Sequence, residues 1–448
     1  MNDNKFHLTT SKSIPNFKGT ISVDSDKSLT IRSFLIASIS HGISTVKNAL
    51  QSEDVFSTID CLKRLGVKIS KDRNNDYKIF GRGLGSLNAS SNTRLNFGNS
   101  GTLARLLLGI LATTPNIKIK ILGDKSLNKR SMEKLIELLN QFGAGFIPKN
   151  KNFFPLKFNS SSLPVGIFYK SGKSAQLKSA AILAGLNSYG VTTIAEKEFS
   201  RDHTEKMLFK NKKVIKVFKS KKKIIKIFGK ETIDNFKINI PGDPSSAAFF
   251  TALTLLKDNS YLKIKNVGLN PTRIGFYILL KKSGAKIKFE NVKLKNNEKV
   301  GDIVINSSKM KPINSSSKFY LNSTDEYPVL FVLAALIKGK SIFHGIGELI
   351  NKESNRIKEM QIILKQIGIK TNFKKGALII YGKNNINFNG KISVPNLGDH
   401  RICMSAVILA LTTGVKSKIK NFETVRTSSP NFLNIINKLG GKYEKKKI

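Results

Sequence analysis

The chain has 448 residues, 40% of them hydrophobic and 24% charged, and it carries a formal net charge of +46. This composition is ordinary for a folded domain, and no apolar run approaches the roughly 18–20 residues that a membrane span requires. The N-terminus lacks the apolar stretch of a signal peptide, so we expect a cytoplasmic protein with no membrane partner. The length exceeds one ordinary core and predicts two domains of roughly 200 residues each.

The large positive charge could indicate binding to nucleic acid, because dense lysine and arginine neutralise phosphates. Only twelve of the 76 basic residues are arginine, however, and the lysines are spread along the whole chain. The densest stretch, residues 210–230, alternates lysine with apolar residues, which predicts a hairpin with one solvent-exposed face. We therefore expect no nucleic-acid partner. The lysines are expected to cover exposed faces and to draw in acidic substrates.

Small polar clusters precede apolar helical patterns at six places along the chain. They are Asp24–Ser28, Gly98–Thr102, Ser171–Gln176, Pro241–Ser246, Asn322–Glu326 and Leu397–Arg401. Their markers, in the same order, are Lys27, Ser100, Ser174, Pro244, Asp325 and His400, spaced by 73, 74, 70, 81 and 75 residues. Such regular spacing predicts six copies of one structural unit.

The same order of elements follows each cluster. An apolar helical pattern such as residues 180–186 ends near glycine, and a β-branched strand such as residues 191–194 comes next. A second helix, another glycine and another strand complete the pattern, as at residues 283–287. Each unit is therefore about βαβαββ, and we predict an α/β protein of two domains with three units each. The predicted domains are residues 24–242, and residues 1–23 together with residues 243–448.

The polar clusters also have a chemical consequence. The first turn of a helix leaves backbone N–H groups without partners, and the helix dipole adds positive potential there. Six such helix starts could together bind several phosphates and carboxylates. The alternative is that each cluster only caps its helix, which serine, threonine and aspartate do well. Charged residues inside five of the clusters favour the first interpretation.

Only two cysteines occur, Cys61 and Cys403, and each lies beside apolar residues. Neither has a partner at the spacing of a zinc site, so both are expected to be buried free thiols. The sequence accordingly predicts no metal and no cofactor.

Nine motifs follow one another within residues 15–440. They are Asp26–Arg32, Phe97–Thr102, Gly123–Arg130, Ser174–Ala180, Ser200–Glu205, Pro241–Ser246, Asp325–Pro328, Lys352–Arg356 and Asp399–Arg401. In this order they resemble the motifs of the enolpyruvyl transferases, and within that family those of the shikimate-pathway branch. The resemblance implies the two-domain enolpyruvyl transferase fold, with inside-out α/β barrel-like domains and an active site in the cleft between them. It also implies a monomer that acts on phosphoenolpyruvate and shikimate 3-phosphate and is a target of glyphosate.

The resemblance assigns binding residues one by one. For shikimate 3-phosphate it implies Lys27, Ser28, Arg32, Ser174, Gln176, Ser200, Arg201, Asp325 and Lys352. For phosphoenolpyruvate it implies Lys27, Gly101, Arg130, Gln176, Arg356 and Arg401. The residue chemistry agrees, since two phosphates and two carboxylates must be held and arginine binds such groups with a forked pair of donors. Five of the twelve arginines lie in these motifs.

The resemblance also implies catalytic roles for Lys27, Asp325 and Glu353. Asp325 would accept the proton of the 5-hydroxyl of shikimate 3-phosphate, and Glu353 would protonate the methylene carbon of phosphoenolpyruvate. Lys27 would touch both substrates. A hydroxyl is a poor nucleophile until a positioned base shares its proton, so a carboxylate in this place has a clear function. The alternative for Asp325 is that it caps its own helix.

Some positions depart from the family's pattern. Arg130 is usually followed by proline, but here Ser131 follows it. Many members carry a lysine near the C-terminus, where this chain has Arg426 in the adjacent position as a possible replacement. Gly101 stands where glyphosate-tolerant relatives often have alanine, so we expect ordinary sensitivity to glyphosate.

Two other functions remain open at the level of the sequence. A cell-wall enolpyruvyl transferase acting on a UDP-sugar shares the fold, but it typically uses a cysteine in a loop that here, at residues 113–130, contains none. A catalytically inactive relative kept for binding is the other possibility, although the set of charged site residues is nearly complete.

Overall fold

The computed structural model describes residues 5–73, 76–90, 92–384 and 390–448. The chain divides into two compact units, which we name the N-unit and the C-unit. The N-unit comprises Ser25–Ile240 and Lys295–Glu298. The C-unit comprises residues up to Asp24, Pro241–Leu294 and Lys299–Ile448. No helix among the described residues is long and apolar enough to cross a membrane.

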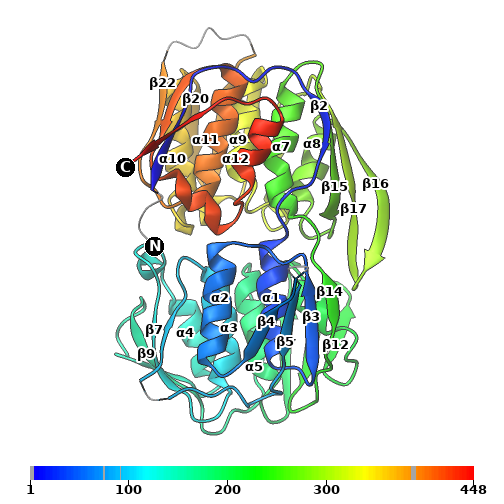
Figure 1. Ribbon diagram of the computed structural model, residues 1–448, viewed down its shortest axis with the longest axis vertical. Coiled ribbons are helices and arrows are strands. Elements are labelled where there is room, and N and C mark those ends of the chain that lie inside the picture. The colour runs from blue at the N-terminus through cyan, green and yellow to red at the C-terminus, as the bar shows by residue number, and fades with distance from the viewer. Residues whose placement is uncertain (1–4, 74–75, 91, 385–389) are drawn as a thin grey trace. The chain divides into compact units, whose positions relative to one another are not determined.

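The elements follow the predicted βαβαββ order in six successive repeats (Figure 1). The first repeat is β2 (Lys18–Ile21), α1 (Lys27–Ser38), β3 (Ile43–Lys47), α2 (Glu53–Arg64), β4 (Lys68–Lys71) and β5 (Tyr77–Phe80). The second is β6 (Arg94–Asn96), α3 (Gly101–Ala112), β7 (Lys118–Leu122), α4 (Glu133–Asn140), β8 (Gly145–Ile147) and β9 (Leu156–Asn159). The third is β10 (Phe168–Ser171), α5 (Ala175–Gly185), β11 (Val191–Glu196), α6 (His203–Leu208), β12 (Ile215–Lys219) and β13 (Lys223–Phe228).

The second half of the chain repeats this order. The fourth repeat is β14 (Lys237–Asn239), α7 (Pro244–Leu256), β15 (Tyr261–Gly268), α8 (Gly275–Lys282), β16 (Lys286–Lys295) and β17 (Glu298–Asn306). The fifth is β18 (Asn314–Ser315), α9 (Tyr327–Leu336), β19 (Gly339–Phe343), α10 (Arg356–Gln366), β20 (Lys370–Lys374) and β21 (Ala377–Gly382). The sixth is β22 (Lys391–Val394), α11 (His400–Thr413), β23 (Lys416–Ile419), α12 (Phe432–Lys438) and β24 (Glu444–Lys447), completed by β1 (Phe6–Thr10).

Two exchanges of strands modify the simple repeat. Across the described residues the strands form six four-stranded sheets. The sheet of the second repeat, β6-β7-β9-β8, is built from the strands of one repeat alone and shows the basic strand order. Strand β14 runs parallel to β3 in the sheet of the first repeat, while β2 runs parallel to β15 in the sheet of the fourth. Strand β1 pairs with both β23 and β24 and so lies between them in the sheet of the sixth repeat. The N-terminal strand therefore lies in the same sheet as the C-terminal one.

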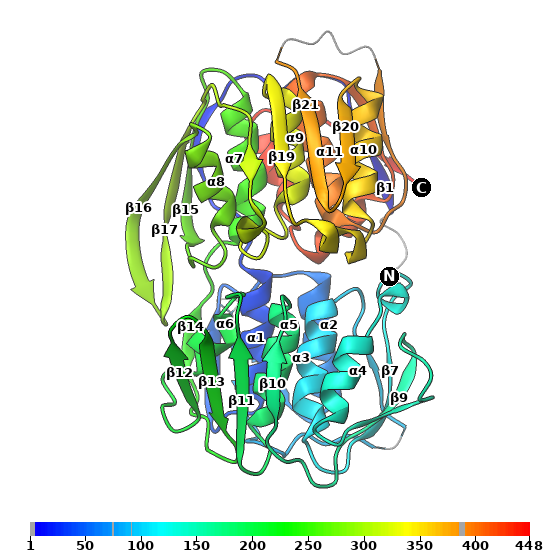
Figure 2. The ribbon, with the colours of Figure 1, turned by 180° about the vertical axis from the view of Figure 1, so that it is seen from behind.

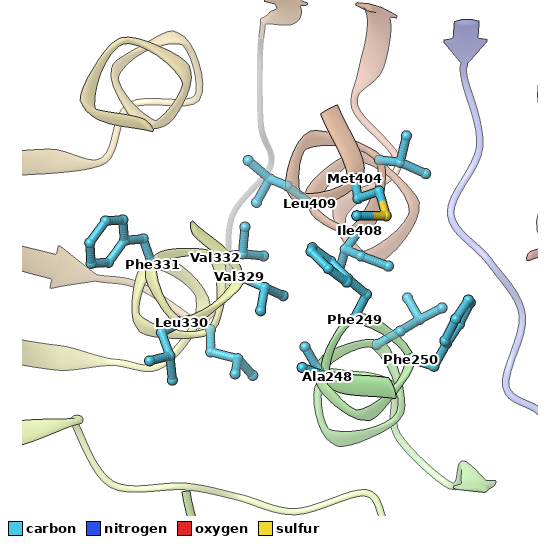
Figure 3. Packing of buried hydrophobic residues seen from close by; sticks show 14 of the residues in the cluster. Ala248, Phe249, Phe250, Val329, Leu330, Phe331, Val332, Met404, Ile408 and Leu409 are labelled. Carbon is cyan, nitrogen blue, oxygen red and sulfur yellow. The ribbon is translucent and has the colours of Figure 1, made fainter. Parts of the chain in front are cut away.

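One helix of each repeat is buried in its unit, and the sheets lie outside these helices (Figures 1 and 2). Helices α1, α3 and α5 are the buried ones of the N-unit, and nearly all their residues are inaccessible to solvent. In the C-unit α7, α9 and α11 pack together through residues such as Phe249, Val329 and Ile408 (Figure 3). Because these helices are apolar on all sides, burial fixes them as the core of each unit.

The lysine-rich stretch at residues 210–230 contains the predicted hairpin, since β12 and β13 pair in antiparallel fashion. The prediction that its lysines cover exposed faces is wrong at one position. Lys223 is buried together with Lys178, which lies on α5, and both contact buried glutamates. The alternating pattern places Lys223 on the same face as Ile225 and Ile227, which is the inward face of the strand.

Candidate active site

All six polar clusters of the sequence lie at the start of a buried helix. In five of the six helices a side chain of the cluster caps the helix by accepting a backbone N–H. The capping residues are Asp26, Ser100, Ser174, Asp243 and Asp399. The exception is α9, whose N-cap is Glu326 without a side-chain cap bond. Asp325 lies one residue before this position, so the capping position of the helix is not its own.

Arg32 joins α1 to two other elements of the N-unit. Its Nε donates to Thr204 Oγ1 at 3.0 Å, its Nη2 to Ser179 Oγ at 3.2 Å, and its Nη1 to the Ser28 carbonyl at 3.1 Å. The side chain is buried, at 3% exposure. Arg32 thus brings α1 close to α5, the helix that also carries Gln176.

Gln176 connects the starts of α5 and α3. Its Nε2 donates to Thr102 Oγ1 at 2.9 Å, and its Oε1 accepts from Arg105 Nη1 at 3.0 Å. The same Arg105 Nη1 also donates to the Gly101 carbonyl at 3.1 Å. A Cβ at Gly101 would lie 2.6 Å from Arg105 Nη1 and 3.3 Å from Arg130 Nη1, so the glycine gives both guanidinium groups their space.

Two further cations complete the N-unit group. Arg130 follows the short 3-10 turn Leu127–Lys129, and its Nη2 donates to Asn99 Oδ1 at 2.9 Å and to Ser126 Oγ at 3.1 Å. Lys27 is the first residue of α1, and its ammonium lies 2.9 Å from the Asp54 carboxylate of α2. The partners of Arg130 lie inside motifs marked in the sequence, whereas Asp54, the partner of Lys27, lies outside them.

Ser200 and Arg201 lie in the loop between β11 and α6. The Ser200 N–H donates to Glu196 Oε1 at 2.8 Å, and its hydroxyl donates to the same oxygen at 2.5 Å. Ser200 is buried, whereas Arg201, Ser174 and Ser28 are half-buried. The structure thus gathers the N-unit candidates on and around the starts of α1, α3, α5 and α6.

In the C-unit, Arg356 is the centre of a group of carboxylates. Its Nε lies 3.0 Å from Asp399 Oδ2, its Nη2 lies 2.6 Å from Glu353 Oε2, and its Nη1 lies 3.7 Å from Asp325 Oδ1. Burial acts against the charge of Arg356, but these three carboxylates outweigh it and raise its pKa above the ordinary value. The guanidinium stays charged, and it holds the two candidate catalytic carboxylates near one another.

The three carboxylates around Arg356 differ in their exposure. The Asp399 side chain is fully buried, and it also accepts a hydrogen bond from Ser354 Oγ at 3.0 Å. The side chains of Asp325 and Glu353 are 25% and 20% exposed, respectively. Asp399 therefore anchors the arginine, while the other two carboxylates remain partly accessible to solvent. Lys352, also half-buried, directly precedes Glu353 in the chain.

Arg401 lies on α11 with its guanidinium carbon 5.9 Å from the ring centre of Phe249, the α7 residue labelled in Figure 3. Among the residues that the structure describes, its buried Nε and Nη1 have no hydrogen-bond partner. Buried donors without partners are costly, so the position suits a residue that receives an anion.

Asp243, whose charge interacts with that of Arg401, is bound by Arg273 Nη2 at 2.9 Å. Burial acts to raise the pKa of Asp243, but Arg273 and Arg401 outweigh it and lower that pKa.

Several residues of these groups were not singled out from the sequence. They are Asp54, Arg105, Asp243, Arg273 and Asp399. A signal existed for two of them, because Asp243 and Asp399 lie inside the marked polar clusters. Arg273 and Arg105 belong to the scarce arginines, but no local motif distinguishes them.

Arg426 lies in a different environment from the residues above. Its guanidinium carbon is 5.9 Å from the ring centre of Phe6, on strand β1. It lines a cavity of about 220 Å³ together with Glu423, Lys445 and Phe422. None of the candidate site residues lines this cavity.

The predicted free thiols are confirmed, since Cys61 and Cys403 are both buried and unbridged. Burial raises the pKa of Cys61 to about 12 and raises that of Cys403 further. Neither thiol is therefore suited to act as a nucleophile near neutral pH.

The chain is similar to known proteins over nearly its whole length. The family model of EPSP synthase (3-phosphoshikimate 1-carboxyvinyltransferase) matches residues 12–436. A 3-phosphoshikimate 1-carboxyvinyltransferase of Paramagnetospirillum magneticum is 36% identical over 427 residues, which are 95% of each chain. One from Thermoanaerobacter pseudethanolicus is 39% identical over 416 residues, covering 93% of this chain and 96% of the relative.

Solved structures show the same likeness. The EPSP synthase of Acinetobacter baumannii superposes with a TM-score of 0.84 at 34% identity, covering 98% of this chain and all of the other. The enolpyruvyl transferase NikO from Streptomyces tendae gives a TM-score of 0.76 at 13% identity over 99% of this chain, a likeness of fold alone. The predicted two-domain enolpyruvyl transferase fold is confirmed. With the family model covering nearly the whole chain and relatives sharing over a third of its residues, this chain belongs to the EPSP synthase family.

Proposed function

We propose that this chain performs the reaction of its family with Asp325 as the base and Glu353 as the proton donor. The reaction itself follows from family membership. The chain is a 3-phosphoshikimate 1-carboxyvinyltransferase, which transfers the enolpyruvyl group of phosphoenolpyruvate to shikimate 3-phosphate in aromatic amino-acid biosynthesis. The roles of individual residues are the proposal.

The single observation that carries the proposal is the position of Arg356 between the two carboxylates. Its Nη2 lies 2.6 Å from Glu353 and its Nη1 lies 3.7 Å from Asp325. Two acid–base groups on one rigid, buried cation keep a fixed separation, and both remain partly exposed. Positioned general acids and bases contribute typically about 10²–10⁴-fold to a rate.

The proposed chemistry is an addition followed by an elimination. Asp325 takes the proton of the 5-hydroxyl of shikimate 3-phosphate while the hydroxyl oxygen bonds to C2 of phosphoenolpyruvate. In the same step Glu353 delivers a proton to the methylene carbon. The product of this step is a tetrahedral intermediate that still bears its phosphate. A methyl proton then returns to Glu353, the C2–phosphate C–O bond breaks, and phosphate leaves with the proton from Asp325.

The proposed binding of shikimate 3-phosphate draws mainly on the N-unit. Ser28, Ser174 and Gln176 lie at the starts of α1 and α5, where backbone N–H groups and the helix dipole favour anions. Arg32 and Arg201 supply guanidinium groups. Lys27 would contact both substrates, and Asp325 and Lys352 would contribute from the C-unit.

The proposed binding of phosphoenolpyruvate uses Arg130, Arg356 and Arg401 with the backbone at Gly101 and the amide of Gln176. The buried donors of Arg401 support its part, since an anion would satisfy them. Arg356 is already bound to carboxylates, so it acts on phosphoenolpyruvate mainly as a fixed positive charge. Holding two substrates in one geometry can lower a barrier by about 7–11 kcal/mol.

We further propose that the enzyme works as a monomer in the cytoplasm, without metal or cofactor. The proposed steps are proton transfers, addition and elimination, and each of them uses side chains of a single chain. Sedimentation of active enzyme as a monomer, with activity unchanged by a chelator, is the expected result. Loss of activity on chelation or on dilution would contradict this part.

Phosphate release by the purified protein tests the function. Release should require both shikimate 3-phosphate and phosphoenolpyruvate, and it should stop when either is omitted. Folded protein that releases no phosphate with both substrates would contradict the function. A UDP-sugar acceptor would then be tested in place of shikimate 3-phosphate.

A further inference from the structure

A cluster of four buried ionic side chains lies in the N-unit next to the candidate residue Ser200. Lys178 of α5 lies 3.0 Å from Glu196 and 2.8 Å from Glu205, and Lys223 contacts the same two glutamates. All four side chains are at most 5% exposed. Two positive and two negative charges balance, so we name this group the closed cluster.

The closed cluster joins four elements of the third repeat. Glu196 ends β11 and Lys223 begins β13, and the two residues are paired across the sheet. Lys178 lies on α5 and Glu205 on α6. Buried ion pairs contribute little net stability because desolvation offsets their attraction. A role in fixing geometry is therefore the better explanation of such a group.

Ser200 is the residue that the closed cluster holds. Its N–H and its hydroxyl both donate to Glu196 Oε1, at 2.8 and 2.5 Å, and its carbonyl accepts from Lys178 Nζ at 3.3 Å. All three polar groups of Ser200 are thus bound by the cluster. The residue is 1% exposed. The position of the next residue, Arg201, follows from this anchoring.

The cluster also adjoins the partners of Arg32. Ser179 follows Lys178 on α5, and Thr204 precedes Glu205 on α6. Arg32 donates to both, and Thr204 Oγ1 donates to Ser179 Oγ at 2.9 Å. The ionic residues and the residues that orient Arg32 are therefore sequence neighbours on the same two helices.

We propose that Glu196 is a positioning residue for shikimate 3-phosphate, which acts through Ser200 to place Arg201. The hydroxyl proton of Ser200 is directed to Glu196, so Ser200 Oγ can only accept hydrogen bonds from a ligand. The closed cluster thus acts on the substrate indirectly, because it fixes the loop between β11 and α6 and with it the position of Arg201. The inference rests on the proposed function, in which Arg201 binds shikimate 3-phosphate.

The cluster offers a matched pair of variants. Glu196→Gln and Glu205→Gln remove the same charge from the same closed cluster, but Glu196 accepts hydrogen bonds from Ser200 whereas Glu205 contacts the two lysines. We expect Glu196→Gln to raise the KM for shikimate 3-phosphate about tenfold. Glu205→Gln should change it less than about twofold, and both variants should leave the KM for phosphoenolpyruvate within about twofold.

Steady-state kinetics and thermal unfolding of the full-length enzyme test the proposal. Similar losses of Tm with different KM values for shikimate 3-phosphate would support positioning. Equal KM changes in the two variants would overturn it, because they would indicate general loosening. If Glu196→Gln does not fold, Glu196→Asp keeps the charge but shortens the reach to Ser200, and an unchanged KM would equally overturn the proposal.

A double variant separates the contact from the charge. If Glu196 acts through Ser200, Ser200→Ala should add less than about twofold to the KM of Glu196→Gln, whereas independent effects would multiply and contradict the proposal. A wild-type enzyme inactive with both substrates would reject the proposed function before any variant is compared. Active wild type with equal variants would reject only the positioning role.

Discussion

The two units hold their buried charges in different ways. In the N-unit the closed cluster pairs two lysines with two glutamates, and all four side chains are at most 5% exposed. In the C-unit Arg356 is as deeply buried, but two of its three carboxylates, Asp325 and Glu353, are 25% and 20% exposed. Every charge of the closed cluster is therefore buried. The second group, Arg356 with Asp325, Glu353 and Asp399, has two partly exposed carboxylates, and we name it the open group.

The difference shows what each arrangement can do. A closed, neutral group fixes the elements around it and cannot exchange protons with a substrate. An open group on a buried arginine combines a rigid anchor with accessible carboxylates. Arginine suits the open group because its planar fork binds several carboxylates at once and keeps its charge. The predictions below test this contrast, from the largest expected effect to the smallest.

Removing the anchor of the open group should have the largest effect on stability. Arg356→Met leaves Asp399 buried without its cation, which should lower the free energy of unfolding by about 3–5 kcal/mol. Urea denaturation measures this change. Arg64→Met is the control, because the Arg64–Asp60 pair is more than half exposed and should contribute far less to stability. Equal losses in the two variants would contradict the anchoring role.

The contribution of the closed cluster to the free energy of unfolding should depend on pH. Burial acts to raise the pKa of Glu196, but Lys178 and Lys223 outweigh it and lower the pKa below its ordinary value. A lowered carboxyl pKa stabilises the folded state above about pH 4.5, and this stabilisation is lost as the pH falls further. Glu196→Gln should therefore cost about 2 kcal/mol at pH 7, through its lost charge-assisted hydrogen bonds.

Urea denaturation of wild type and Glu196→Gln at pH 7 and pH 3.5 checks this expectation. The difference in free energy of unfolding should narrow at the lower pH, because Glu196 of the unfolded chain takes up its proton near pH 4.5 and folding must then release it. A difference that is the same at both pH values would mean that the charge of Glu196 does not stabilise the fold.

Gly101 should matter for phosphoenolpyruvate rather than for stability. An alanine Cβ would lie 2.6 Å from Arg105 Nη1 and 3.3 Å from Arg130 Nη1, so both guanidinium groups would have to shift. We expect Gly101→Ala to raise the KM for phosphoenolpyruvate about tenfold and to weaken inhibition by glyphosate. An unchanged KM for phosphoenolpyruvate, or wild-type enzyme that saturating glyphosate does not inhibit, would contradict this prediction.

Arg426 should have the smallest effect. Its guanidinium lies over Phe6 and beside Glu423 and Lys445, in a cavity that none of the candidate site residues lines. Arg426→Ala should change the KM for phosphoenolpyruvate less than about twofold, whereas Arg401→Ala should raise it strongly. A large increase in Arg426→Ala would show that Arg426 does supply the charge of the usual lysine.

Much of the fold was predictable because the repeats carry local signals. A polar cluster before an apolar run marks a helix start in any context, so all six starts were found by their spacing. The exchange of β2 and β14 between sheets was not predictable, since a short strand carries no mark of the sheet that it joins. Only the tertiary packing within each unit decides that pairing.

The candidate residues were predictable through family motifs, but their partners were not. Arg356 stands in a motif, yet nothing local shows that its fork reaches Asp399, 43 residues away. Lys223 was interpreted as a surface lysine because the chain has so many lysines, and its position within the strand was not considered. Its place on the Ile225 and Ile227 face was the available signal, and a lysine on such a face requires buried anions.

The most direct test of the contrast compares one neutralised carboxylate from each group. Asp325→Asn and Glu205→Gln are assayed for phosphate release with both substrates and for thermal unfolding. We predict that Asp325→Asn lowers kcat about 10²–10⁴-fold with little change in Tm. Glu205→Gln should instead lower Tm and retain most of kcat. An active Asp325→Asn enzyme, or a Glu205→Gln enzyme that folds normally but has lost turnover, would contradict the assignment of chemistry to the open group.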